Sequence, residues 1–307
     1  MAKNPSNNAL PPTIDGVAAK RWLTMPVKTD APWLHEEVGK RMVERLPWIK
    51  KTPSSWLHWN PAQGGLATHR RVADLYQKSP CFLAFEHMDN AQAAIKKIAY
   101  PWWNQRHWTL PAAQALACDA MPPSAVQMLW ANMCLHTQAD PQSLLMQWYR
   151  ALAVDGFLMF SCLGPDTVKE MRGLYEKLGL GACGHSFTDM HDWGDMLVQA
   201  GFAEPVMDME RIVLSFATPE RALQELRGLG RNLHPQRFAA LRGKKYLENL
   251  QSAMDQHLRG ADGQIQLTFE VVYGHAFKPT PRIKVSAQSA VSIQDMRAML
   301  AQGKAVG

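Results

Sequence analysis

The sequence predicts an α/β protein with a seven-stranded, mostly parallel sheet and helices on both faces. Two observations support this fold class. Short apolar segments, such as Cys81–Glu86 and Phe157–Leu163, alternate with helical segments, which is typical of buried parallel strands. Near the end of the chain, Ile265–Phe277 alternates apolar and polar residues, which predicts a long antiparallel strand at or near the sheet edge.

The chain begins with a polar segment, residues 1–20, which is rich in Asn and Pro and is expected to be a mobile tail. Trp33–Leu46 is predicted to form an amphipathic helix, because Val38, Met42 and Leu46 recur at four-residue steps. The apolar face of this helix is therefore expected to pack against the sheet.

Two strand–helix units are expected next. The first joins a strand at Ser55–Trp59 to a helix at Leu66–Gln77, and the second joins the strand Cys81–Glu86 to a helix at Asn90–Ala99. Pro101 is expected to end the second helix, because the residue before a proline disfavours helical geometry.

The middle of the chain continues this alternation. Trp103–Leu110 is predicted to hold a short strand. The elements expected after it are a strand at Ala125–Ala131, a helix at Pro141–Ala153, the strand Phe157–Leu163, and helices at Asp166–Leu178 and Met190–Ala200.

The last third is expected to differ from the rest. Pro205–Phe216 reads as a long strand, and residues 218–260 read as a helical lid insertion of two helices around a Gly- and Arg-rich turn. We therefore expect one domain over residues 21–278. A basic tail with a short helix at Ile293–Ala301 is expected to follow over residues 279–307.

Composition and charge restrict the function classes. The chain is 47% hydrophobic and 20% charged, which is enough apolar material for a large core. The net charge of +6 favours an acidic partner, but no run of Lys and Arg points to nucleic acid. The absence of a signal-like or membrane-length apolar stretch predicts a cytoplasmic protein without a membrane partner. The five cysteines and eleven histidines lack metal-site spacing, so no metal is expected.

Four segments in the second half resemble a known family. They read Leu163-Gly164-Pro165-Asp166-Thr167, Asp189-Met190-His191-Asp192-Trp193-Gly194-Asp195, Ala200-Gly201-Phe202-Ala203-Glu204-Pro205 and Glu270-Val271-Val272-Tyr273-Gly274-His275-Ala276. In this order they resemble the malonyl-[acyl-carrier protein] O-methyltransferases of biotin synthesis. The resemblance implies a class I S-adenosylmethionine-dependent methyltransferase with a Rossmann-like sheet.

The resemblance also implies a reaction. In this family a methyl group moves from S-adenosylmethionine to the free carboxylate of a malonyl thioester. A carboxylate is already ionised at pH 7, so the reaction needs no general base and we assign no catalytic residue. Catalysis would then depend on the proximity and orientation of the two bound partners.

The family binds its cofactor at the first strand-to-helix turn. Here the family's acidic position falls on His58, and its three glycine positions fall on Asn60, Ala62 and Gly64. Glycines allow close backbone approach, whereas Pro61 fixes φ and lacks an N–H. Two interpretations stay open: a variant cofactor loop, or a turn that only connects the strand to the helix.

Three polar residues are candidates for the remaining cofactor contacts. Glu86 ends the second strand and is expected to bind the ribose hydroxyls, with a solvated strand end as the alternative. Asp119 is the candidate for the adenine amino group. Asn132 follows the fourth strand and is expected to face the cofactor, unless it only caps a turn.

Basic residues of the lid insertion are candidates for binding an acidic carrier protein or the substrate carboxylate. They are Arg231, Arg242, Lys244 and Lys245. The alternative is an ordinary solvated helix face.

Three functions are consistent with the sequence. The first is an active methyltransferase, and the second is a catalytically degenerate methyltransferase fold, a pseudoenzyme, that binds an acidic carrier protein. The third, a nucleic-acid-binding module, ranks last because the aromatic side chains are expected to be buried rather than exposed between basic residues.

Overall fold

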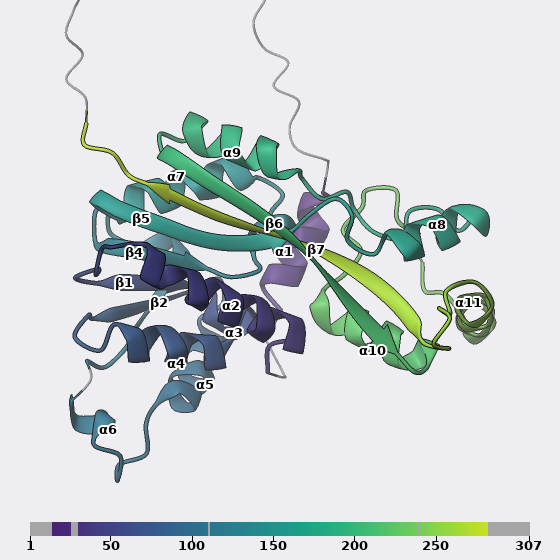
Figure 1. Ribbon diagram of the computed structural model, residues 1–307, viewed down its shortest axis with the longest axis horizontal. Coiled ribbons are helices and arrows are strands. Elements are labelled where there is room, and N and C mark those ends of the chain that lie inside the picture. Colours follow the sequence, from purple (N-terminus) through teal and green to yellow (C-terminus); the bar gives the residue numbers. More distant parts are fainter. Residues whose placement is uncertain (1–13, 26–29, 110, 239, 282–307) are drawn as a thin grey trace, which may run out of the picture.

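The computed structural model describes residues 14–25, 30–109, 111–238 and 240–281. Its centre is a seven-stranded sheet in the order β3-β2-β1-β4-β5-β7-β6 (Figure 1). Strands β1 to β5 pair in parallel, and β7 is antiparallel to both of its neighbours, which confirms the predicted fold class. The strands are β1 (Trp56–Trp59), β2 (Cys81–Phe85), β3 (Gln114–Ala117), β4 (Val126–Ala131), β5 (Leu152–Leu163), β6 (Ala203–Phe216) and β7 (Ile265–Phe277).

Helices cover both faces of the sheet, and buried apolar side chains form one cluster on each side (Figure 1). On one face lie α2 (Trp33–Arg45), α4 (Leu66–Leu75) and α5 (Asp89–Ile98). On the other face lie α7 (Pro141–Ala151) and α9 (Met190–Gln199). The carboxylate of Asp189 caps α9 by accepting the backbone N–H of His191.

The hairpin of β6 and β7 extends past the parallel strands. The two strands pair as far as Phe216 and Ile265, whereas β5 ends opposite Val271. The free end of the hairpin leads toward α10 (Pro219–Leu229) and α11 (Lys244–His257) (Figure 1). The predicted pair of lid helices therefore lies beyond the carboxyl ends of the parallel strands.

The polar face of β7 is buried near its start, contrary to what its alternation indicates. Thr268 and Glu270 are only 7% and 6% exposed. The hydroxyl of Thr268 donates to the carboxylate of Glu170 in α8 (Lys169–Lys177), and the hydroxyl of Thr167 donates to the backbone oxygen of Glu270. Because α8 covers this face, its polar side chains are paired rather than solvated.

Helix α1 (Gly16–Leu23) begins before residue 21, the predicted start of the domain. The carboxylate of Asp15 caps this helix and also accepts a hydrogen bond from Arg237 at 2.6 Å, which ties α1 to the lid insertion. The rest of the N-terminal tail, and the predicted helix at Ile293–Ala301, lie outside the described residues.

The predicted strand at Trp103–Leu110 is wrong. The described part of this segment forms turns and a short helix, α6 (Arg106–Thr109), and the third strand is β3 instead. The side-chain oxygen of Asn104 accepts the backbone N–H of Arg106 at 3.0 Å and so starts the helical turn. Asn favours such local side-chain-to-backbone bonds, which compete with strand pairing.

The expectation of buried aromatic side chains is only partly correct. Trp102, Trp103 and Trp108 are each at least 70% exposed, around α6 at the periphery of the molecule (Figure 1). The large buried aromatic side chains, such as Trp56 and Trp130, lie in the core beside the sheet. Sequence alone did not separate these two groups.

Helices α2 and α4 pack closely at the position of Gly39. A Cβ atom on Gly39 would lie 2.4 Å from Oγ1 of Thr68, so only glycine allows this approach. The carboxylate of Glu36 accepts the backbone N–H groups of Ala67 at 3.0 Å and of Thr68 at 2.8 Å. Glu36 therefore caps α4, whose first N–H groups have no partner within the helix.

Replacing Glu36 with alanine is expected to lower the free energy of unfolding by about 1–2 kcal/mol, because the first turn of α4 loses its cap. Urea unfolding followed by circular dichroism measures this change. Glu44→Ala, at an exposed position on the same helix, is the matched control and should change stability little. Equal stability of the two variants would contradict the assignment of the cap.

Candidate functional site

The turn after β1 is a short helical turn, α3 (Pro61–Gly64), rather than an open loop. Asn60 precedes it in the left-handed region, with φ of 47°, a conformation that Asn tolerates better than most residues. The backbone oxygen of Asn60 accepts the N–H groups of Gln63 at 3.1 Å and Gly64 at 3.0 Å. The N–H groups at the end of this turn are therefore already bonded within it.

Asn132, at the end of β4, fastens this turn to its surroundings. Its side-chain N–H₂ donates to the backbone oxygens of His35 at 2.7 Å and Gly64 at 2.5 Å. Its side-chain oxygen accepts the hydroxyl of Ser161 at 2.6 Å. The side chain is fully buried, so Asn132 positions α2, the turn and β5 relative to one another.

His58 lies beneath α4. Its side chain is fully buried, and its Nδ1 is 3.2 Å from Nδ1 of His69 on that helix. Its Nε2 lies 3.2 Å from where a Cβ on Gly64 would be. His58, Gly64 and Asn132 are thus brought together around the turn, and a larger residue at position 64 would be crowded.

Glu86 and Asp119 meet at the carboxyl ends of β2 and β3. These strands pair in register up to Phe85 and Ala117, so the two acids follow on adjacent strands. Partial desolvation by the surrounding protein raises the pKa of Glu86, a hydrogen bond with the thiol of Cys118 lowers it, and the charge of Asp119 raises it. As whole residues, Glu86 and Asp119 are both exposed to solvent.

A cavity of about 600 Å³ opens beside the turn at the carboxyl ends of β1 and β4. His35, Gln63 and Met133 line one side, and Arg231 of the lid insertion lines another. Nδ1 of His35 lies 2.7 Å from the backbone oxygen of Gln63, while its buried Nε2 has no partner. Burial lowers the pKa of His35, so the imidazole is neutral and Nε2 is an acceptor.

A second cavity, of about 280 Å³, lies between α8, the end of β5 and the lid insertion. The two cavities share lining residues, among them Thr137, Leu229 and Arg231. Val168, before α8, has φ of 50°, and Met133 in the first cavity has φ of 54°. Such left-handed conformations are strained for these residues, and strain of this kind gathers at functional sites.

The four basic lid residues that the sequence proposed do not gather at one place in the structure. Arg231 lines both cavities, with its guanidinium 4.9 Å above the ring of Trp22. Arg242 is held among aromatic rings and donates to the backbone oxygen of Leu180 at 2.9 Å. Lys244 and Lys245 lie exposed at the start of α11. Only Arg231 among the four is a lining residue of these cavities.

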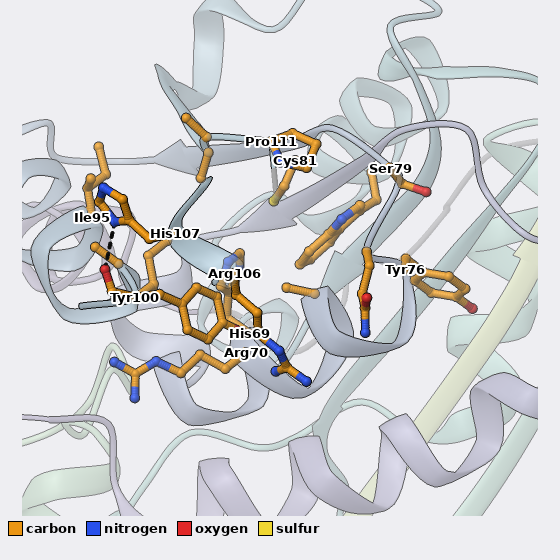
Figure 2. A pocket seen from close by; sticks show the side chains of 17 residues that line it. His69, Arg70, Tyr76, Ser79, Cys81, Ile95, Tyr100, Arg106, His107 and Pro111 are labelled. Carbon is orange, nitrogen blue, oxygen red and sulfur yellow. Dashed lines mark hydrogen bonds between the residues drawn. The ribbon is translucent and has the colours of Figure 1, made fainter. Parts of the chain in front are cut away.

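A third cavity, of about 200 Å³, lies at the opposite end of the sheet, where β2 begins. Figure 2 shows the side chains that line it. Its lining includes Cys81 at the start of β2, together with His69, Tyr100 and Arg106. Arg106 and the hydroxyl of Tyr100 both donate hydrogen bonds to the carboxylate of Asp74, so these two polar groups of the cavity wall are already paired. This cavity is separate from the carboxyl edge.

Sequence reasoning missed three residues of the carboxyl edge: His35, Thr137 and Arg172. His35 and Arg172 lie on helices, at positions that read as ordinary polar residues of an amphipathic pattern. Only the fold shows that they face cavities. Among the described residues, no group of three or more metal-ligating side chains occurs, and no helix is long and apolar enough to span a membrane.

Several histidines of the fold are held neutral. Burial lowers the pKa of six imidazoles below the usual value of 6.5, to about 4 for two of them. The six are His35, His58, His69, His136, His185 and His275.

Stability is therefore expected to fall as pH decreases from 6.5 toward 4. In that window the unfolded chain binds more protons than the folded chain, so His69 and His275, whose pKa is about 4, each cost about 1 kcal/mol at pH 5.5. Urea unfolding at pH 7.5 and 5.5 measures the loss. His191→Gln, at an exposed position, should leave the difference unchanged. Equal midpoints at the two pH values would contradict the buried neutral state.

The chain is similar in sequence to one group of known proteins and similar in fold to other solved structures. No protein-family model matches the chain. The chain is 36% identical over 256 residues to the malonyl-[acyl-carrier protein] O-methyltransferase of Gallionella capsiferriformans, covering 81% of this chain and 86% of that protein. It is 34% identical over 262 residues to the enzyme of that name from Laribacter hongkongensis, covering 81% and 84%.

Among solved structures, the YcgJ protein of Bacillus subtilis matches with a TM-score of 0.53 and 9% identity, covering 79% of this chain and 100% of that one. At this identity the likeness shows the fold alone.

Proposed function

The chain belongs to the malonyl-[acyl-carrier protein] O-methyltransferase family, and from that membership we propose that it methylates the free carboxylate of a malonyl thioester on an acyl-carrier protein. The observation that carries the proposal is the pair of adjoining cavities at the carboxyl ends of the strands, one beside the turn after β1 and the other beneath the lid insertion. A reaction between two bound partners needs such neighbouring sites. The predicted cytoplasmic location stays part of this proposal.

The residues present fit S-adenosylmethionine. Glu86 offers an acceptor for ribose hydroxyls, and Asp119 on the adjacent strand offers one for the adenine amino group. The buried Nε2 of His35 is an acceptor without a partner, in the lining of the 600 Å³ cavity. An ammonium group, which only donates, suits such an acceptor.

When bound, S-adenosylmethionine would supply a methyl group on a sulfonium, whose sulfur would keep the electron pair of the broken S–C bond while the carboxylate oxygen formed the new O–C bond. The residues of this chain would bind the cofactor and the acyl substrate and orient them toward each other. The turn fastened by Asn132 forms one wall of the first cavity, and Arg231 borders both cavities. The apolar side chains of Leu229 and Phe269 restrict water in the second cavity.

The carrier protein is proposed to bind the exposed basic surface of the lid insertion. Lys244 is 89% exposed, and Lys245 beside it is exposed as well. Exposed charges at the rim of an interface act mainly on the rate of encounter. We therefore assign these lysines to steering an acidic partner rather than to binding the carboxylate.

The degenerate alternative is favoured by one observation. The N–H groups of Gln63, Gly64 and Gly65 are all bonded within the α3 turn, so they are not free for a ligand. Under this alternative the chain binds the carrier protein without transferring a methyl group.

Incubating the purified chain with S-adenosylmethionine and malonyl-acyl-carrier protein separates these candidates. The proposed activity predicts release of S-adenosylhomocysteine and a carrier mass increased by one methyl group. Binding of the carrier without methylation would support the degenerate alternative. A carrier with an acetyl group, which lacks the free carboxylate, is the negative control.

A further inference from the structure

Arg172 on α8 is an arginine whose charge has no carboxylate partner among the described residues. Two other half-buried arginines are paired, Arg41 with Glu210 at 3.1 Å and Arg237 with Asp15 at 2.6 Å. Arg242 also has a buried Nη atom without a partner, but its guanidinium lies over aromatic rings and it lines neither cavity. Nη1 of Arg172 donates to the backbone oxygen of Pro165 at 2.6 Å. Its Nη2 is buried and has no hydrogen-bond partner.

Arg172 lines the 280 Å³ cavity beneath the lid insertion. Its guanidinium lies 5.6 Å from the ring centre of Phe187, which lines the same cavity. Leu163, Met171 and Phe269 make much of the remaining wall apolar. A buried N–H donor of a cation without a partner costs free energy, and an anionic ligand would remove that cost.

The other polar groups of this cavity do not supply the missing anion. Nε2 of His185 donates to the backbone oxygen of His136 at 3.1 Å, and its Nδ1 has no partner. The hydroxyl of Thr167 is used by the backbone of Glu270. Arg227 and Arg231 also line the cavity, but both are exposed, so Arg172 is the half-buried cation beside its apolar wall. This arrangement suits a short acyl chain that ends in a carboxylate.

We infer that Arg172 binds the free carboxylate of the acyl substrate through Nη2, an inference that rests on the proposed methyl transfer. In this arrangement Nη1 stays bonded to Pro165, Nη2 donates to one carboxylate oxygen, and the other carboxylate oxygen attacks the methyl carbon. The ester that forms is neutral and no longer pairs with Arg172. The product is therefore bound more weakly than the substrate, which favours its release.

The test compares Arg172→Gln and Arg172→Lys with the wild type in methyl-transfer kinetics at saturating S-adenosylmethionine. Glutamine removes the charge and should raise the KM for malonyl-acyl-carrier protein by roughly 10- to 100-fold. Lysine keeps the positive charge but lacks the planar guanidinium with its several N–H donors, so its KM should lie between those of the wild type and the glutamine variant. Arg150→Gln, at an exposed position near the end of α7 and outside the lid insertion, is the matched control and should leave KM unchanged.

Measuring the binding of the carrier protein in the absence of the cofactor tests this inference separately from the proposed methyl transfer. The wild type should bind malonyl-acyl-carrier protein more tightly than its methyl ester, and Arg172→Gln should lose that preference while retaining the wild-type melting temperature within a few degrees. If glutamine lowers the melting temperature further, the same comparison is made with Arg172→Lys, which should keep part of the preference. If the wild type forms no ester but shows the preference, the proposed reaction fails and the carboxylate site stands. If the wild type and the variants prefer malonyl-acyl-carrier protein over its methyl ester to the same degree, Arg172 does not bind the carboxylate.

Discussion

Replacing Glu86 with alanine is expected to weaken the binding of S-adenosylmethionine by roughly 10- to 100-fold. The loss has this size because a hydrogen bond to a charged acceptor contributes about 1.5–3 kcal/mol. The pKa of Glu86 is raised, so the wild-type affinity should also fall as pH decreases and the carboxyl becomes protonated. Equilibrium dialysis with the labelled cofactor measures both effects.

The matched control for this experiment is Asp89→Ala. Asp89 lies at the start of α5, close to Glu86 in the chain, and its side chain is 78% exposed. This variant should retain the wild-type affinity. If Glu86→Ala binds as tightly as Asp89→Ala, the cofactor's ribose does not lie at the end of β2.

Replacing Gly274 with valine is expected to lower the free energy of unfolding by about 3 kcal/mol. Gly274 on β7 pairs with Phe160 on β5, and a Cβ atom there would lie 2.0 Å from the ring of Phe160. That ring is fully buried, so it has no space to move into. Thermal unfolding should show a melting temperature lowered by roughly 6–12 °C.

Gly173→Ala on α8 provides the opposite case. No atom lies within 4 Å of the position of its added Cβ, and the residue sits inside a helix, where alanine is favoured by about 0.5–1 kcal/mol. This variant should be slightly more stable than the wild type. A destabilised Gly173→Ala together with an unaffected Gly274→Val would contradict the packing of both helix and sheet.

The sequence allowed most of the fold to be predicted because hydrophobic periodicity reports burial directly. The buried strands β2 and β5 and the paired strands β6 and β7 were found in this way. Strand β3 was missed, since Gln114–Ala117 is short and only partly buried at the far edge of the sheet. Such an edge strand carries little apolar signal.

The site was less predictable, because its residues meet only after folding. Glu86 and Asp119 could be proposed, since the ends of neighbouring parallel strands share one edge. Asn132 was also proposed, but its bonds join it to the backbone of residues far away in the chain, so it holds the turn in place. Arg172 had no sequence signal, because a single arginine on an amphipathic helix usually faces solvent.

Calorimetric titration of the purified full chain with S-adenosylhomocysteine measures whether the cofactor binds at the carboxyl edge of the sheet. We expect saturable binding of one ligand per chain at micromolar concentrations, despite the bonded N–H groups of the α3 turn. No heat of binding at any sub-millimolar concentration would rule out this cofactor site and favour a fold that recognises the carrier protein alone.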